Sequence, residues 1–186
     1  MATPAKKNAT YDDLYRIPDN MTGEIIDGEL HAMPRPSPRH TKVTSDLGAV
    51  ITYSYRFGRG GPGGWIILDE PELQFGEHTL VPDIAGWEKE RFPSSLETNW
   101  IEVPPDWICE VLSPATVRLD KTRKMPIYAE HAVRHIWLIN PMDKTLDVFR
   151  LTSGGWLLVN AFVENDTVRA EPFQEIEIDL ADLWLD

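Results

Sequence analysis

Residues 104–114 read PPDWICEVLSP, and this short apolar stretch predicts a central strand of the fold. The segment from Trp107 to Leu112 is apolar apart from Glu110, which is the pattern of a strand packed on both faces. A carboxylate in such a place costs several kcal/mol unless a partner compensates for its burial. We therefore expect Glu110 to have a partner and a function.

The composition around this strand is that of an ordinary globular domain with an excess of acid. The chain has 186 residues, 42% hydrophobic and 26% charged, which predicts one domain with a sizeable core. The net charge of −12 argues against a protein that coats nucleic acid by charge alone, although a local basic patch stays open. The single cysteine, Cys109, excludes an internal disulfide and is expected to be a buried thiol.

The ends and flanks of the chain carry no targeting signal that we recognise. No stretch approaches the roughly 18 apolar residues of a membrane span, and residues 1–10 lack the apolar run of a signal peptide. We expect a cytoplasmic protein in which residues 1–10 are flexible.

Periodicity predicts a mixed α/β (α+β) fold in which helices flank a mixed sheet. Asp27-Gly28 between apolar pairs is a strong hairpin signal, and apolar residues at three- and four-residue steps predict a helix from His40 to Phe57. The expected elements in order are a hairpin over 23–38, helix 40–57, loop 58–64, strands 65–76, 79–87 and 107–112, helix 118–132, and strands 135–140, 145–151 and 156–163.

Two acidic residues are expected at the ends of neighbouring strands. Asp83 closes one predicted strand, and Glu110 lies in the next predicted strand. Such carboxylates can hold Mg²⁺, with the backbone carbonyl of Val111 as a third oxygen and waters completing the shell. The cation would lower the pKa of a bound water and neutralise charge on a phosphoryl oxygen, so a nearby lysine becomes the next residue to find.

The Pro-Asp and Glu spacing resembles the PD-(D/E)XK nuclease superfamily, and the wider order of motifs resembles its Uma2 (DUF820) branch. The resembling segments are GEIIDGEL (23–30), PSPRH (36–40), VPDIAGW (81–87), PPDWICEVLSP (104–114), DKTRKMPIYAEHAVRHIWLINP (120–141) and LDVFRL (146–151). The resemblance implies a single restriction-endonuclease-like domain over 1–186, with a central mixed sheet and an N-terminal hairpin. It also implies Mg²⁺- or Mn²⁺-dependent hydrolysis of phosphodiester bonds in DNA.

The lysine departs from the superfamily pattern. Leu112 stands where the superfamily has a lysine two residues after the glutamate, and we expect it to point into the core. In the Uma2 branch a lysine lies on the following helix, and Lys124 occupies that motif position, with Lys121 as an alternative one turn away. A third interpretation is that Lys121 and Lys124 are a solvated pair that balances the charges of Asp120 and Glu130. If Lys124 acts only on the reaction, Lys124→Ala should leave folding nearly intact.

Several auxiliary residues also match or neighbour the motifs. Glu24, Glu29 and His40 occupy family positions in the hairpin and at the start of the first helix, where surface or capping roles stay open. Glu70 and Glu72 lie on a predicted strand that could neighbour Asp83, and either is a candidate for an extra acidic ligand.

Two hypotheses of different class follow. The first is a Mg²⁺-dependent DNA endonuclease, expected as a homodimer because two copies of one site most simply cut a duplex. The second is a catalytically inactive nuclease-fold module that binds protein or nucleic acid, which the acidic charge and the displaced lysine favour. Convergence of Asp83, Glu110 and Lys124 within about one metal shell would favour the enzyme.

Overall fold

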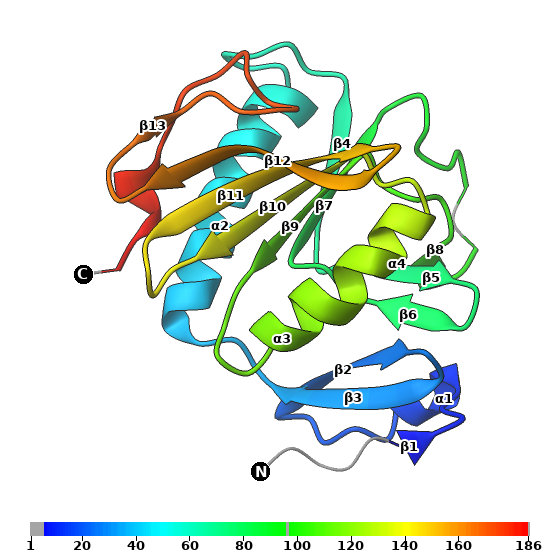
Figure 1. Cartoon of the computed structure of the whole chain (residues 1–186). Coiled ribbons are helices and arrows are strands. Elements are labelled where there is room, and N and C mark those ends of the chain that lie inside the picture. Colours follow the sequence, from blue (N-terminus) through cyan, green and yellow to red (C-terminus); the bar gives the residue numbers. More distant parts are fainter. Residues whose placement is uncertain (1–5, 96, 186) are drawn as a thin grey trace.

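The computed structural model describes residues 6–95 and 97–185, and within these ranges the chain forms two six-stranded sheets (Figure 1). The sheet with the longer strands is called the larger sheet below. It is mixed, because β9 and β10 run parallel while its other neighbouring strands are antiparallel. Its strands, in spatial order, are β12 (Gly155–Val163), β11 (Thr145–Thr152), β10 (His135–Asn140), β9 (Trp107–Val111), β7 (Ile84–Glu88) and β4 (Trp65–Asp69). This confirms the predicted mixed sheet.

Helices cover both faces of the larger sheet (Figure 1). On one face lies α2 (Pro38–Ile51), which continues as the π-helical turn η1 (Thr52–Arg56). On the other face lies a continuous helical segment of α3 (Val117–Leu119), the π-helical turn η2 (Asp120–Lys124) and α4 (Met125–Glu130). Both predicted helices are therefore confirmed.

The predicted hairpin is confirmed and belongs to the second sheet. Strands β2 (Met21–Ile26) and β3 (Glu29–Pro34) pair antiparallel around Asp27 and Gly28, whose φ angles of 51° and 68° are the left-handed values of a type I′ turn. The sheet order is β1-β3-β2-β6-β5-β8. Its other strands are β1 (Lys6–Lys7), β5 (Glu72–Phe75), β6 (His78–Leu80) and β8 (Trp100–Ile101), and helix α1 (Tyr11–Leu14) precedes β2.

The expected flexible segment over 1–10 falls partly on residues 1–5, which lie outside the described residues. Among the described residues, Lys6 and Lys7 form β1 beside β3, and the Ala9 N–H donates to the Gly28 carbonyl at 2.8 Å.

The two strands predicted over 65–76 and 79–87 are each split in two. Residues 65–76 become β4 in the large sheet and β5 in the second sheet, and residues 79–87 pass from β6 back to β7. Pro71 and Pro82 stand at the breaks, where the absence of an N–H prevents a continuous ladder, and Glu70 turns the chain with a φ of 46°. Asp83 is thereby placed where the chain re-enters the large sheet.

The C-terminal part of the chain completes the core beneath α2. Strands β10, β11 and β12 form the predicted meander, and the two-stranded sheet of β13 (Thr167–Val168) and β14 (Ile178–Asp179) leads into the 3₁₀ turn η3 (Leu180–Leu183). Phe173 and Leu180 pack into the same cluster as Leu47 of α2. No helix in the described part of the chain is long and apolar enough to cross a membrane.

Candidate active site

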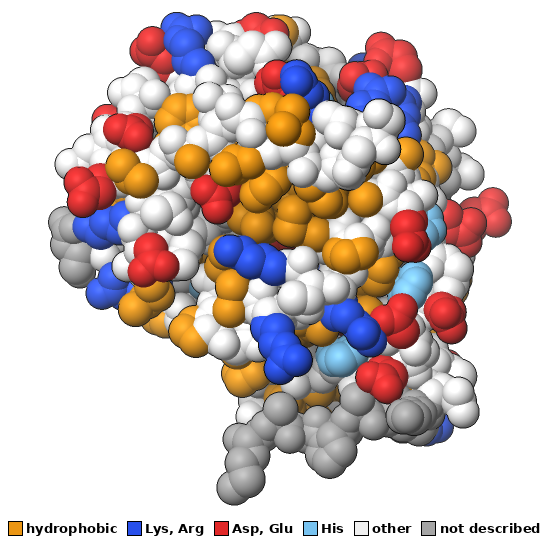
Figure 2. Space-filling view, in the orientation of Figure 1, with side chains coloured by type: hydrophobic (Ala, Val, Ile, Leu, Met, Phe, Trp, Pro, Cys, Tyr) orange, Lys and Arg blue, Asp and Glu red, His pale blue; other side chains and the backbone are white. Residues whose placement is uncertain are grey.

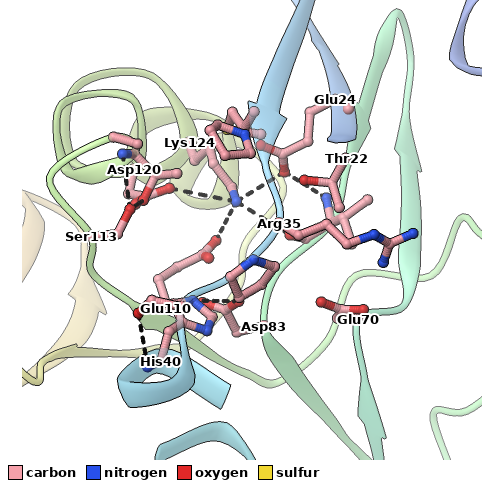
Figure 3. A pocket seen from close by; sticks show the side chains of 18 of the residues that line it. Thr22, Glu24, Arg35, His40, Glu70, Asp83, Glu110, Ser113, Asp120 and Lys124 are labelled. Atoms are coloured by element: carbon pink, nitrogen blue, oxygen red, sulfur yellow. Dashed lines mark hydrogen bonds and ion pairs between the residues drawn. The ribbon is translucent and has the colours of Figure 1, made fainter. Parts of the chain in front are cut away.

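A cavity of about 340 Å³ opens where the two sheets meet, beside the start of α2. Figure 3 shows polar side chains of β2, β9, α2 and η2, and of the loops between the elements, gathered around it. The ionisable residues in its lining are Glu24, Arg35, His40, Glu70, Asp83, Glu110, Asp120 and Lys124. Asp83, Glu110 and Lys124 are the residues that the sequence predicted to be catalytic, and Glu24, His40 and Glu70 were auxiliary candidates.

Asp83 and Glu110 are brought together by strand pairing. Strand β7 pairs with β9 so that Ile84 lies opposite Cys109, and continuing this register by one residue places Asp83 opposite Glu110. The Val111 N–H donates to Asp83 Oδ2 at 2.6 Å, which ties the carboxylate to the end of β9. Because residues directly opposite share a face of the sheet, both carboxylates lie on the same side.

Glu110 and Leu112 face the α4 side of the sheet. Cys109 and Val111 pack in the core against α2, and residues alternate along a strand, so Glu110 points the other way. Leu112 is 4% exposed and belongs to the core beneath α4, so the prediction that it points into the core is confirmed. It therefore cannot take the place of the missing lysine at the cavity.

Lys124 reaches the carboxylates from η2. Its side chain is buried, and Nζ lies 2.8 Å from Glu110 Oε1, 2.9 Å from Glu24 Oε1 and 3.7 Å from Asp120 Oδ1. Lys121, in contrast, is exposed and is absent from the cavity lining. The interpretation of Lys121 and Lys124 as a solvated pair balancing Asp120 and Glu130 is wrong for Lys124, because Lys124 and Asp120 are both buried.

Several carboxyl groups surround the single ammonium group of Lys124. Burial raises the pKa of Glu110 well above its usual value; Lys124 lowers it in part, but Asp120, Asp83 and Glu24 raise it further. Burial alone would lower the pKa of Lys124, yet the attraction of Glu110 and Glu24 lifts it well above its usual value. These carboxyl groups therefore favour the protonated form of Lys124.

His40 and Tyr128 hold the two acids from opposite sides. His40 Nε2 lies 3.1 Å from Asp83 Oδ1, and Ser37 caps the helix that carries it by accepting the His40 N–H at 3.4 Å. Burial lowers the pKa of His40, but the hydrogen bond and charge of Asp83 outweigh this effect and the net shift is upward. The Tyr128 hydroxyl donates to Glu110 Oε1 at 2.7 Å.

The other candidates divide between the cavity and the surface around it. Glu24 joins the site through Lys124 and also accepts the Val81 N–H at 2.7 Å, while Glu70 lines the cavity. Glu29 pairs with Ile26 across the hairpin and has no place in the cavity lining, and Glu72 accepts the hydroxyl of Tyr11.

Asp120 also lines the cavity, although it was not predicted as a site residue and belongs to the motif segment 120–141. The signal was its position four residues before Lys124 on the same helix, which places both side chains on one face. Burial raises the pKa of Asp120 to about 6; Lys124 and the Thr116 hydroxyl oppose this shift, while Glu24 and Asp83 add to it.

The residues present fit a hard divalent cation. Both contacts of the Glu110 carboxylate use Oε1, so Oε2 can bind a cation without breaking either one. The surplus of carboxylates that raises the pKa of Glu110 is a charge that such a cation would neutralise. In the described ranges no three His, Cys, Asp or Glu residues form a ligand group. Two carboxylates, with backbone oxygen and water as the remaining ligands, are nevertheless a common way of coordinating Mg²⁺ in proteins.

Stability of the metal-free protein is expected to fall as pH rises from about 4 to 8. The folded pKa of Asp120 is about 6 against 3.8 unfolded, so its ionisation destabilises the fold by about 3 kcal/mol above pH 6 and by nothing below pH 4. His40 acts in the same direction, because its raised pKa gives a stabilisation that is lost as pH rises through that value. Thermal melts in EDTA should show this slope, and Asp120→Asn should reduce it. A wild-type melting temperature that rises over this range would contradict the assignment.

The mixed sheet and the acid-rich cavity with its buried lysine define a protein of the nuclease-like α+β class. The chain belongs to the Uma2 family, described as "Putative restriction endonuclease", whose model matches residues 9–181. It is similar to a solved structure from Anabaena variabilis, described as a "putative nuclease belonging to DUF820". The two chains are 26% identical, with a TM-score of 0.74 over 94% of this chain and 97% of the other. A comparison with curated proteins gives no match.

Proposed function

We propose that this chain is a cytoplasmic, Mg²⁺- or Mn²⁺-dependent endonuclease that hydrolyses phosphodiester bonds of DNA. The observation that carries the proposal is the convergence of Asp83, Glu110 and Lys124 in one cavity, with Lys124 Nζ 2.8 Å from Glu110 and Asp83 opposite Glu110 in the strand register. An inactive binding module has no need of a buried lysine held among carboxylates at a cavity.

Asp83 and Glu110 are the proposed side-chain ligands of the cation, with the Val111 carbonyl as a third oxygen. When bound, the cation would supply an activated water and neutralise negative charge on the phosphate. The Val111 N–H and His40 fix the Asp83 carboxylate from two sides, so the ligand is held in place before the cation arrives.

Lys124 is proposed to stabilise negative charge on the scissile phosphate. Because its pKa is raised, it keeps its proton at neutral pH and is unsuited to abstract one from water. Glu24 and Glu110 fix its ammonium at the cavity, which gives the preorganised charge that electrostatic catalysis requires.

Unpaired cations near the cavity support a nucleic acid as substrate. Arg35 lines the cavity, while Arg118 and Lys121 lie on the helical segment that also carries Asp120; all three are exposed. Among the described residues no carboxylate pairs with these three cations, whereas many other cations of the chain are paired, including Arg16, Lys42, Arg91, Arg123, Arg134, Arg150 and Arg169. Figure 2 shows Lys and Arg side chains over the α3 and η2 segment. We assign these free charges to DNA phosphates.

Glu110→Gln is expected to weaken Mn²⁺ binding at least tenfold, or about 1.4 kcal/mol. The substitution removes a ligand charge but keeps the size of the side chain and an oxygen for the Tyr128 hydroxyl. Calorimetric titration of the metal-free protein with Mn²⁺ measures the effect, with Glu102→Gln at an exposed position as the matched control. Equal Mn²⁺ affinity in wild type and Glu110→Gln would remove Glu110 from the site.

A further inference from the structure

Strand β12 leaves one edge of the larger sheet open. It is the outermost strand of that sheet and pairs along its other side with β11. Within the described residues no second strand pairs with its outward edge. Such an edge presents a row of backbone donors and acceptors to any strand that approaches it.

Most of this edge lacks the features that normally protect an exposed strand; at its end, Asp166 occupies both the N–H and the carbonyl of Val163. Between Arg150 and Glu164 the sequence contains no charged residue and no proline, although 26% of the chain is charged. Proteins usually place lysine, proline or inward charges on open edges to prevent pairing with another chain. The β12 edge is instead chemically suited to pairing.

Strand β12 carries apolar side chains that are about half exposed. Leu157, Leu158 and Val163 are 47%, 49% and 50% exposed, and Leu158 lies opposite Phe149 of β11. Figure 2 shows hydrophobic side chains gathered over the region of β11 and β12, which the helices α3 and α4 leave uncovered. An exposed apolar surface beside an open strand edge marks an interaction site.

We propose that β12 pairs antiparallel with β12 of a second copy of this chain and joins the two large sheets into one. A strand pairing antiparallel with itself forms a closed two-fold contact, in which each copy presents the same surface. The charge of the chain favours contact here, because two copies of net charge −12 repel each other and this edge is where the sequence is free of charge.

The proposed pairing also determines how the cavities of the two copies lie relative to each other. A two-fold axis perpendicular to the joined sheet keeps both α4 faces, and hence both Glu110 side chains, on the same side. From β9 to its symmetry mate there are seven inter-strand steps of about 4.8 Å, or roughly 34 Å, close to one turn of B-DNA. This second consequence rests on the proposed nuclease function, whereas the dimer itself does not.

Sedimentation velocity and light scattering without DNA test the dimer. Wild type should have twice the 21.2 kDa mass of the chain, and Leu158→Lys should have the mass of one chain because two charges would meet at the joined edge. Tyr53→Lys, at an η1 residue of similar exposure (53%), is the matched control and should remain dimeric.

Amide hydrogen exchange of unmodified wild type gives a second measurement that needs no substitution. Amides on the outward edge of β12 should be protected, and dilution to the monomer should remove that protection. A monomeric wild type, or a dimer in which Leu158→Lys stays dimeric and β12 amides exchange freely, would overturn the proposal. Because neither measurement involves DNA or metal, failure of the nuclease assignment would leave these results unchanged.

Discussion

Replacing Lys124 with alanine is expected to abolish most DNA hydrolysis and to lower the free energy of unfolding by about 3–5 kcal/mol. The side chain is 2% exposed, and its removal leaves the carboxylates of Glu24 and Glu110 buried without their counterion. The sequence suggested that Lys124→Ala would leave folding nearly intact, and the burial of the residue overturns that expectation. Urea denaturation and a Mg²⁺ nuclease assay of the same preparation measure the two effects.

Loss of activity must be separated from loss of fold, and a second variant does this. In the double variant Glu110→Gln with Lys124→Met, one buried charge of each sign is removed, so its stability should exceed that of Lys124→Met alone. Lys121→Ala, at an exposed position of the same turn, should change stability by less than about 0.5 kcal/mol. A Lys124→Met protein that is as stable as wild type and cuts DNA at the same rate would contradict the role of Lys124.

Local patterns predicted the parts of the fold that depend on neighbouring residues. Asp27-Gly28 specified the hairpin because both positions need a positive φ, which these residue types tolerate. The apolar run of β9 specified a strand with both faces buried, and all of its residues from Trp107 to Val111 are buried. In each case the physical cause acts within a few residues of the chain.

The second sheet was not predictable in the same way. Strand β4 is separated from β5, and β6 from β7, by a short break that contains one proline. A sequence pattern cannot distinguish a bend within one strand from a crossing between two sheets. The crossing matters for the site, because it forms the junction at which Glu24 of β2 meets Glu110 of β9 through Lys124. Contacts between residues so far apart in sequence follow from the packing of the sheets.

The candidate site shows the same division. Asp83 and Glu110 were found from strand ends and motif order, and Lys124 from its position on the following helix. The burial of Asp120 was harder to predict, because aspartate usually lies at the protein surface. Asp120 is nevertheless 4% exposed because its helix packs over the cavity. Glu29 occupies a motif position, but it lies at the turn end of β3, four residues from Met33 of the cavity lining, and is itself outside that lining.

The largest loss of activity is expected for Asp83→Asn. This variant should reduce Mg²⁺-dependent hydrolysis of DNA at least a hundredfold, because disturbing even the residues that orient a ligand costs about 10–100-fold. Asparagine keeps an oxygen that can accept the Val111 N–H, so the end of β9 should stay in place while the charge beside Glu110 is lost. Asp83→Ala removes the acceptor as well and should be less stable by about 1–3 kcal/mol.

The comparison of these two variants separates the chemical role of Asp83 from its structural one. Asp46→Asn is the matched control, since Asp46 is partly exposed and pairs with Lys42 on α2, and it should cut DNA at the wild-type rate. Calorimetry should show Mn²⁺ affinity lost in Asp83→Asn, with a melting temperature in EDTA close to that of wild type. If Asp83→Asn cuts DNA normally while only Asp83→Ala is impaired, the carboxylate serves as a hydrogen-bond acceptor for β9, and the cation must be held by other oxygens of the cavity.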